Sequence, residues 1–474
     1  MSKKFTALSF TVALALAGVM GLLWLLGGGT PSAHADSPHR VAPDCTGIPA
    51  PCHTTIQEAV DAASPGDVIQ VATGVYTDVH GLLAPPGYPD PPTSGIITQV
   101  VCISKTVTIR GGYTTTNWTT PYPITQPTTL DAQGQGRVIL IAGDPSTSSG
   151  QAISPTIEGL HITGGDATGL GGGGWHPGDV GGGVHIISAT ATISNNWVFS
   201  NTAYRGGGLF LSSDSVTLSN NTVISNIADF GGGLYLGESD ATLSGNTVIS
   251  NTAVDVGGGL VVVGNATLSG NIIISNIANL GGGLILAYTA VTLTNNVVVD
   301  NRANTAGSGL YIYGASPRLL HTTIARNGLA GLIADSGGDS SGVYITDAGY
   351  DAYSTVALTN TILVSHSVGI SVTGGNTVTV NSILWHGTPV TISQATTATV
   401  TVQNQHQSDP LFAADGYHLM EGSAAIDKGV DAGVDTDIDG DLRPQGSAPD
   451  LGADERAGIG TDVYLPIIMK NASP

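Results

Sequence analysis

Few charged side chains in this sequence are spaced so that they could act together on a substrate. Asp214 and Asp240 are 26 residues apart, and Arg205 is the one arginine between Arg137 and Arg302. Two carboxylates and a guanidinium can serve as acid, base and charge stabiliser when a polysaccharide is cleaved. Both acids also fall where turns are expected, and solvated turn positions are a common use of aspartate. The sequence therefore favours a non-catalytic protein; for an enzyme, the predicted catalytic residues are Asp214, Asp240 and Arg205.

Four aspartates near the C-terminal end alternate with other residues in a pattern typical of calcium-binding loops. They are Asp435, Asp437, Asp439 and Asp441. Acids at alternate positions can surround one hard cation, and Gly440 allows the sharp turn between them. The twelfth position of this loop is Gly446 instead of a bidentate glutamate, so a complete EF-hand loop is excluded. These four residues are the candidate ligands of a structural Ca²⁺, and a solvated acidic turn is the favoured interpretation.

Two rows of apolar side chains are expected to point outward. The first row is aromatic, and the residues predicted to stack on sugar rings are Phe210, Tyr235 and Tyr311. Aromatic faces suit sugars because they bury apolar area and leave polar edges free. The second row, here called the apolar stripe, consists of Phe199, Ile224, Ile249, Ile274 and Val299. An exposed stripe of this kind marks an interaction surface, or another part of the chain covers it.

A repeat of 25 residues must position these side chains. Two series of asparagines keep this step, namely Asn196, Asn221, Asn246, Asn271 and Asn296, and Asn201, Asn226, Asn251, Asn276 and Asn301. Glycine triplets follow nearly the same step, and short runs such as Val216–Leu218 alternate with a period of two. Glycine, threonine and valine disfavour helical repeats, and the leucine content is too low for leucine-rich repeats. The sequence therefore predicts an all-β, right-handed parallel β-helix, in which stacked asparagines form amide ladders and tolerate left-handed turns.

The repeats resemble those of known exported proteins. "GGGL" at Gly206–Leu209 and "VISN" at Val223–Asn226 are similar to the two tetrapeptides of polymorphic outer membrane proteins, with glycine for alanine and valine for phenylalanine. The chain also resembles the β-helix superfamily that contains pectate lyases. That resemblance implies a polysaccharide lyase or glycoside hydrolase as the alternative to a non-catalytic role.

The N-terminal region predicts export. Lys3 and Lys4 precede an apolar run and an "AHA" site ending at Ala35, which is typical of a cleaved signal peptide. An uncleaved membrane anchor is the alternative. After export a disulfide is allowed, and Cys45 and Cys52 are the favoured pair because they close a short loop, although Cys102 leaves other pairings open. Residues 54–77 predict a short amphipathic helix that closes the open end of the core.

The C-terminal region resembles a different exported module. "DPLFAADGYHLMEGSAAIDKG" followed by "DTDIDGDLRPQGSAPDLGADE" is similar to the choice-of-anchor Q domain, which implies an exported or surface-attached protein and does not indicate a particular activity. The tail "VYLPIIMKN" at Val463–Asn471 is interpreted as a sorting signal or as a last apolar strand. The predicted boundaries are 1–35 for the signal peptide, 36–130 for the cap and first coils, 131–408 for the β-helix with regular repeats at 181–310, 409–455 for the anchor-like segment and 456–474 for the tail.

The charge of the chain restricts its partners. The formal net charge is −21, and only 10% of the residues are charged. A sparsely charged acidic surface disfavours nucleic acid and anionic lipid and is compatible with glycans, cations or surface proteins. The sequence predicts an exported, non-catalytic protein with an adhesin-like, glycan-binding or envelope role. A structural coat protein is the second alternative.

Overall fold

The fold is taken from a computed structural model of the chain, which describes residues 38–143, 153–174, 178–212, 215–237, 239–329, 341–349 and 352–456. All its strands lie in one compact unit, His39–Pro474. The predicted signal peptide and apolar tail, residues 1–35 and 457–474, lie outside the described residues. Within the described part of the chain, no helix is long and apolar enough to cross a membrane.

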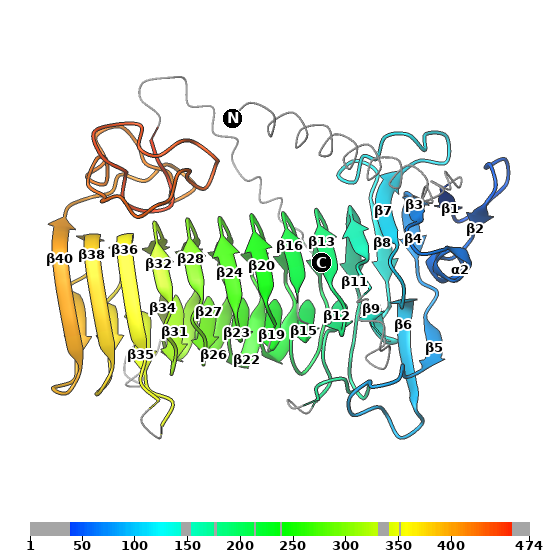
Figure 1. The fold of residues 1–474 in the computed structure, drawn as a ribbon, viewed down its shortest axis with the longest axis horizontal. Coiled ribbons are helices and arrows are strands. Elements are labelled where there is room, and N and C mark those ends of the chain that lie inside the picture. Colours follow the sequence, from blue (N-terminus) through cyan, green and yellow to red (C-terminus); the bar gives the residue numbers. More distant parts are fainter. Residues whose placement is uncertain are drawn as a thin grey trace, which may run out of the picture. The chain divides into compact units, whose positions relative to one another are not determined.

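Three sheets wind together into a right-handed β-helix, as the sequence predicted (Figure 1). Sheet 1 has two strands in most coils, and its 23 described strands are β1 (His39–Val41), β2 (Cys52–His53), β3 (Val68–Ala72), β4 (Gly74–Tyr76), β7 (Thr108–Tyr113), β8 (Thr128–Asp131), β10 (Thr156–Glu158), β11 (Leu160–Thr163), β13 (Ala191–Ser194), β14 (Trp197–Phe199), β16 (Val216–Ser219), β17 (Thr222–Ile224), β20 (Ala241–Ser244), β21 (Thr247–Ile249), β24 (Ala266–Ser269), β25 (Ile272–Ile274), β28 (Thr292–Thr294), β29 (Val297–Val299), β32 (Arg318–Leu320), β33 (Thr323–Ala325), β36 (Thr355–Val364), β38 (Thr377–His386) and β40 (Thr399–Gln407).

Sheets 2 and 3 complete each coil. The 12 described strands of sheet 2 are β5 (His80–Leu83), β6 (Ile96–Ile103), β9 (Arg137–Ala142), β12 (Val184–Ile187), β15 (Leu209–Ser212), β19 (Leu234–Gly237), β23 (Leu260–Val263), β27 (Leu284–Ala287), β31 (Leu310–Tyr313), β35 (Ser341–Thr346), β37 (Val368–Val372) and β39 (Val390–Gln394). The five described strands of sheet 3 are β18 (Ile227–Phe230), β22 (Thr252–Val256), β26 (Ile277–Leu280), β30 (Arg302–Ala306) and β34 (Gly328–Leu329).

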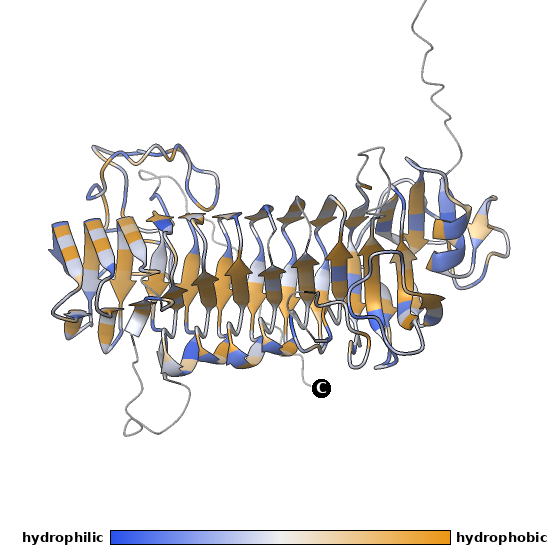
Figure 2. Cartoon of the chain, turned by 60° about the horizontal axis from the view of Figure 1, so that its bottom comes forward, coloured by the Kyte–Doolittle hydropathy of each residue, from blue (hydrophilic) through white to orange (hydrophobic). Residues whose placement is uncertain are grey.

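Inward side chains of sheets 1 and 2 form one apolar core along the coils. The strands are mostly hydrophobic in Figure 2, and alternate residues such as Val216 and Leu218 are buried. One helix, α2 (Ile56–Ala62), covers the N-terminal end of this core with Ile56, Ala59 and Val60. Thr55 and Glu58 form a capping box that fixes where α2 begins. The expected helical cap is therefore present.

The two predicted asparagine ladders are confirmed. In the second ladder, the Asn226 Nδ2 donates to Asn251 Oδ1 and the Asn251 Nδ2 donates to Asn276 Oδ1, each over 3.0 Å. Each buried amide also bonds to backbone groups, so its hydrogen-bonding capacity is used inside the core. The left-handed turn position is not the ladder asparagine, contrary to expectation, because its side chain must point inward. The preceding residue takes that position, as Asn220 (φ 54°) and Ser225 (φ 55°) show.

A histidine ends the second ladder. Asn327 donates from its backbone N and its Nδ2 to the His366 Nε2, over 3.3 and 3.2 Å, when that nitrogen carries no proton. Burial, and secondarily the charge of Arg326, lowers the pKa of His366 to about 3. The neutral ring is therefore the form that accepts the hydrogen bonds of the ladder.

Acid should weaken this end of the β-helix. The pKa of His366 is depressed in the folded chain relative to an ordinary value near 6.5, so its contribution is complete above that pH and lost as the pH falls towards 3. The unfolding free energy should drop by up to about 1.4 kcal/mol per pH unit for this one proton. We expect His366→Asn, which keeps an amide at this position, to reduce that dependence in denaturation at pH 7, 5.5 and 4.5. Equal pH dependence in the variant and the wild type would contradict this role.

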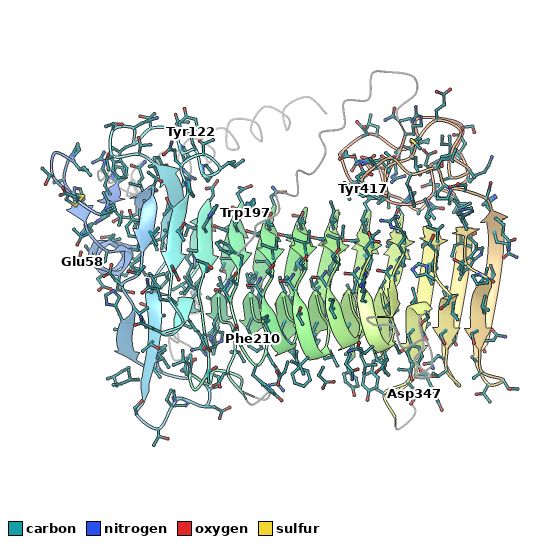
Figure 3. The ribbon with its side chains drawn as sticks, turned by 180° about the vertical axis from the view of Figure 1, so that it is seen from behind. Glu58, Tyr122, Trp197, Phe210, Asp347 and Tyr417 are labelled. Atoms are coloured by element: carbon teal, nitrogen blue, oxygen red, sulfur yellow. A yellow bond between two sulfur atoms is a disulfide. The ribbon has the colours of Figure 1, made fainter. Side chains whose placement is uncertain are left out.

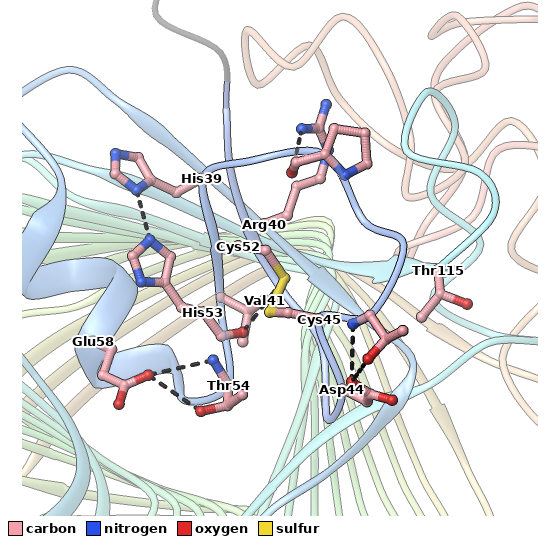
Figure 4. Close-up of a disulfide and its surroundings, with 12 residues drawn as sticks. His39, Arg40, Val41, Asp44, Cys45, Cys52, His53, Thr54, Glu58 and Thr115 are labelled. Carbon is pink, nitrogen blue, oxygen red and sulfur yellow. Dashed lines mark hydrogen bonds between the residues drawn. A yellow bond between two sulfur atoms is a disulfide. The ribbon is translucent and has the colours of Figure 1, made fainter.

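A disulfide closes the loop before α2. Cys45 and Cys52 are joined in the structure, with their Cα atoms 5.8 Å apart (Figure 4). Cys102 is unpaired and half-buried in β6, and the Gln57 Oε1 accepts a hydrogen bond from its backbone N over 2.7 Å. A disulfide is typical of exported proteins.

After β40 the chain forms a turn-rich segment, residues 409–456, which packs back onto sheet 1. We call this the C-terminal segment. Its Leu419, Leu451 and Ala453 are buried against Val297 and Val299 of β29. Arg443 and Glu455 form a fully buried ion pair of 2.9 Å that holds two of its turns together.

Candidate functional site

One face of sheet 1 combines exposed aromatic, apolar and charged side chains. It lies between the loop that joins β7 to β8, residues 114–127, and the C-terminal segment. Figure 3 shows Tyr122 of that loop, Trp197 of β14 and Tyr417 of the C-terminal segment on the same side of the coils, whereas Phe210 lies on the opposite side. Two hollows occupy this face, one at each end. We call them the aromatic cleft and the apolar groove.

The aromatic cleft has a volume of about 400 Å³ and is lined by Arg110, Gly111, Pro121, Pro123, Ile124, Glu158, Gly159, His161, Asn195, Trp197 and Asn220. Trp197 and His161 occupy paired positions on adjacent coils, so their rings stack with centroids 5.5 Å apart and planes at 20°. Trp197 is 48% exposed despite this contact. Burial lowers the pKa of His161, so its ring is neutral near pH 7 and offers one donor and one acceptor.

An ion pair forms the polar side of the aromatic cleft. Arg110 of β7 and Glu158 of β10 are partners in the parallel register, and the Arg110 Nε donates to the Glu158 Oε2 over 2.8 Å. Both side chains are about one-third exposed. The pair therefore holds a fixed set of donors and acceptors in the cleft that Trp197 also lines.

The loop of residues 114–127 forms the wall of the cleft. Ile124 at its edge is 87% exposed. Gly159 follows Glu158 in the left-handed region (φ 69°), and a Cβ there would lie 3.2 Å from the Pro123 Cβ. The glycine thus allows the wall to approach the strands and also turns the chain from Glu158 to His161.

Of the predicted catalytic residues, Arg205 and Asp240 are described, and they lie at opposite ends of sheet 2 strands. Arg205 lies over the rings of Tyr204 and Phe230, with its Cζ 4.8 and 5.0 Å from their centroids. Asp240 is exposed in the turn that precedes β20, beyond the other end of β19. Asp214 lies outside the described residues. No pair of carboxylates lines the aromatic cleft either, since Glu158 is the one acid among its described lining residues.

The aromatic row predicted to bind sugars is largely covered. Phe210 and Tyr235 are 1% and 5% exposed and stack on each other, and Tyr311 is half-buried against Tyr344. The row does point away from the main core, but side chains from the ends of sheet 3 strands pack onto it, namely Phe230, Val256 and Leu280. These rings form a second core, so their faces are not free to bind a sugar.

One end of the apolar stripe is covered by the C-terminal segment, and the other end is partly exposed. The pairing of β14, β17, β21, β25 and β29 aligns its five residues in one row, as predicted. The C-terminal segment covers the end of the row at Ile274 and Val299. Phe199 and Ile224, at the other end, remain half-buried and lead towards the aromatic cleft.

The predicted calcium-binding aspartates have different surroundings. Asp437 is 5% exposed and caps its own turn, because its Oδ1 accepts from the backbone N of Asp439 and Asp441. Asp435 and Asp441 are exposed. Asp439 lies 2.6 Å from the His418 Nε2, and with Asp454 these two have ligand atoms within 4.8 Å of one another. Although burial opposes it, hydrogen bonds to Asp415 and Asp439 raise the pKa of His418 to about 10.

Sequence reasoning missed the four residues that define the aromatic cleft. Arg110, Glu158 and His161 lie in coils before the regular repeats, where no fixed spacing connects them. Trp197 lies within the repeats, at the position that Thr222 and Thr247 occupy in later coils. A tryptophan where later coils have threonine was the feature of the sequence that could have indicated this site.

Comparisons with known proteins agree on the fold. The family model "Right handed beta helix region" matches residues 178–298. The catalytic unit of an α-1,3-glucanase from Streptomyces thermodiastaticus is 13% identical, covering 79% of this chain and 69% of its own, with a TM-score of 0.44. Pectate lyase Pel9A is 15% identical, with coverages of 84% and 90% and a TM-score of 0.33.

The A-module of the mannuronan C-5 epimerase AlgE4 from Azotobacter vinelandii is 16% identical, with coverages of 76% and 93% and a TM-score of 0.37. No curated protein matches the sequence. The family model supports a right-handed β-helix over the residues it matches. The structural likenesses carry no argument about activity.

Proposed function

We propose that this protein is an exported, non-catalytic β-helix protein that binds a glycan in the aromatic cleft. The observation that carries the proposal is Trp197, which is half exposed, stacks on His161 and lines the same cleft as the Arg110–Glu158 pair. A rigid aromatic face with nearby polar groups suits a sugar ring, since the ring has apolar faces and hydroxyls at its edges. A volume of about 400 Å³ is in the range of small-ligand sites.

The lining of the cleft favours binding over cleavage. Hydrolysis of a glycosidic bond commonly uses two carboxylates, and Glu158 is already engaged by Arg110. Resemblance to polymorphic outer membrane proteins and to the choice-of-anchor Q domain supports a cell-surface location, with the predicted signal peptide directing export. In this proposal the C-terminal segment takes part in surface attachment.

Two measurements on the same set of polysaccharides test this function: binding of the protein and cleavage of the polysaccharide. Full-length protein is run through gels that contain acidic or neutral polysaccharides, and reducing ends are measured on the same substrates. We expect retarded migration on at least one polysaccharide without new reducing ends. Release of reducing ends would support the enzyme alternative, and no retardation on any polysaccharide would contradict glycan binding.

We also propose that a Ca²⁺ ion stabilises the turn of Asp435, Asp437, Asp439 and Asp441. The carboxylates of Asp435 and Asp441 are exposed. Carboxylate oxygens are hard donors, which Ca²⁺ prefers. Saturating Ca²⁺ should raise Tm by about 5 °C over chelator, since binding to the folded state alone stabilises it. Asp435→Asn with Asp441→Asn should remove the shift, and Asp431→Asn, at an exposed position nearby, should keep it. Equal Tm values with Ca²⁺ and chelator would exclude a structural ion.

A further inference from the structure

The apolar groove lies where the C-terminal segment meets the apolar stripe. It has a volume of about 810 Å³ and is lined by Thr247, Ile249, Ile272, Ile274, Val299, Asp300, Arg326, Phe412, Ala413, Ala414, Asp415, Gly416 and Tyr417. Four of the five lining residues from β21, β25 and β29 are aliphatic. These aliphatic side chains suit an apolar peptide, and Thr247 and the Asp300–Arg326 ion pair, which also line the groove, can hydrogen-bond to its backbone.

This groove continues an interface that already exists within the chain. Val297 and Val299 are fully buried under the C-terminal segment, and Ile272 and Ile274 are partly covered by it. Ile249, in the coil before Ile274, also lines the groove. Ile224, in the coil before that, is the next residue of the stripe. An additional apolar segment placed here would extend the same contact by one or two coils, each about 4.8 Å.

The chain leaves the described structure beside this groove. The Arg456 guanidinium donates to the carbonyl of Leu419 over 3.0 Å, and its backbone N donates to Asp450. Leu419 follows Tyr417 by two residues, and Tyr417 lines the groove. Six residues separate Arg456 from Val463, where the apolar run "VYLPIIM" begins. Six extended residues span at most about 20 Å, which is enough to cross several coils.

We propose that residues 463–469 dock in the apolar groove of their own chain and cover the adjacent part of the stripe. The segment is tethered next to the groove, which gives it a high effective concentration and an advantage over the same segment of a second copy. Side chains must make the contact, because the outer face of a sheet offers no free backbone groups. Pro466 lacks a backbone N–H and so leaves one donor fewer to be satisfied. This site is separate from the aromatic cleft, so the inference goes beyond the proposed glycan binding.

Disulfide trapping in the full chain tests the docking. Thr247→Cys lines the groove and is combined with Ile467→Cys; the matched control combines Ile467→Cys with Thr267→Cys, on the neighbouring strand column of sheet 1. We expect the groove pair to form an intramolecular disulfide about tenfold faster than the control pair, because docking raises its effective concentration. Peptide mapping identifies the link. Equal rates, or a disulfide only between two chains, would overturn the proposal.

Tail variants give a second test that leaves the β-helix unchanged. Ile467→Asp with Ile468→Asp should release the segment and raise the binding of an apolar fluorescent dye several-fold. Asp462→Asn, just before the apolar run, is the control and should not change it. Dye binding that is the same in wild type and in the double variant would show that the groove is not covered by this segment.

Discussion

Asn251→Ala is expected to lower the free energy of unfolding of the central coils by about 3–6 kcal/mol, because it leaves several buried groups without partners. The Asn251 Oδ1 accepts from the backbone N and the Nδ2 of Asn226, and its Nδ2 donates to the carbonyl of Val223. Alanine can satisfy none of them, and the position is fully buried. Hydrogen exchange at the amides of β17, β21 and β25 measures the loss.

Asn265→Ala is the matched control for this ladder variant. Asn265 lies 14 residues further along the chain at an exposed position, so its replacement should change the same free energy by less than about 0.5 kcal/mol. Similar effects of the two substitutions would contradict the view that the amide ladder, rather than asparagine content, holds the coils together.

Trp197→Ala is expected to weaken glycan binding by about 2 kcal/mol, a roughly 30-fold increase in Kd. The substitution removes the one broad aromatic face among the described lining residues, because the His161 imidazole, which also lines the cleft, is smaller and polar. Trp197→Phe keeps a smaller ring and should retain most of the affinity. Titration of the polysaccharide that retards the protein most strongly gives the three Kd values.

Tyr288→Ala provides the control for this variant. Tyr288 is 59% exposed and packs edge-on against Tyr313 of sheet 2, away from the aromatic cleft. Its removal should leave Kd unchanged. If Tyr288→Ala and Trp197→Ala weakened binding equally, the aromatic cleft would not be the binding site.

The fold could be predicted from the sequence because each coil repeats the same local requirements. Buried asparagines must be hydrogen-bonded, and a 25-residue step lets each find its partner in the next coil. The close approach of Gly208 to the Gly233 carbonyl, where a Cβ would lie 2.6 Å away, explains why glycine recurs there. These are contacts between equivalent positions, so periodicity alone indicates them.

The candidate site could not be predicted in the same way because it depends on non-equivalent contacts. Phe210 and Tyr235 alternate like outward residues, yet Phe230 and its equivalents, from a different sheet, cover them. Arg110 and Glu158 meet across 48 residues, and His161 meets Trp197 across 36, because insertions lengthen the early coils. Only the register of the folded chain places these four residues around one cleft.

The most direct test of the central claim is a crystal structure of the full chain with an oligosaccharide of the polysaccharide that binds best. The proposed function predicts a sugar ring stacked on the indole of Trp197, between Ile124 and the Arg110–Glu158 pair, with its glycosidic bonds intact. A sugar bound elsewhere on the β-helix, or a cleaved oligosaccharide in the cleft, would contradict it.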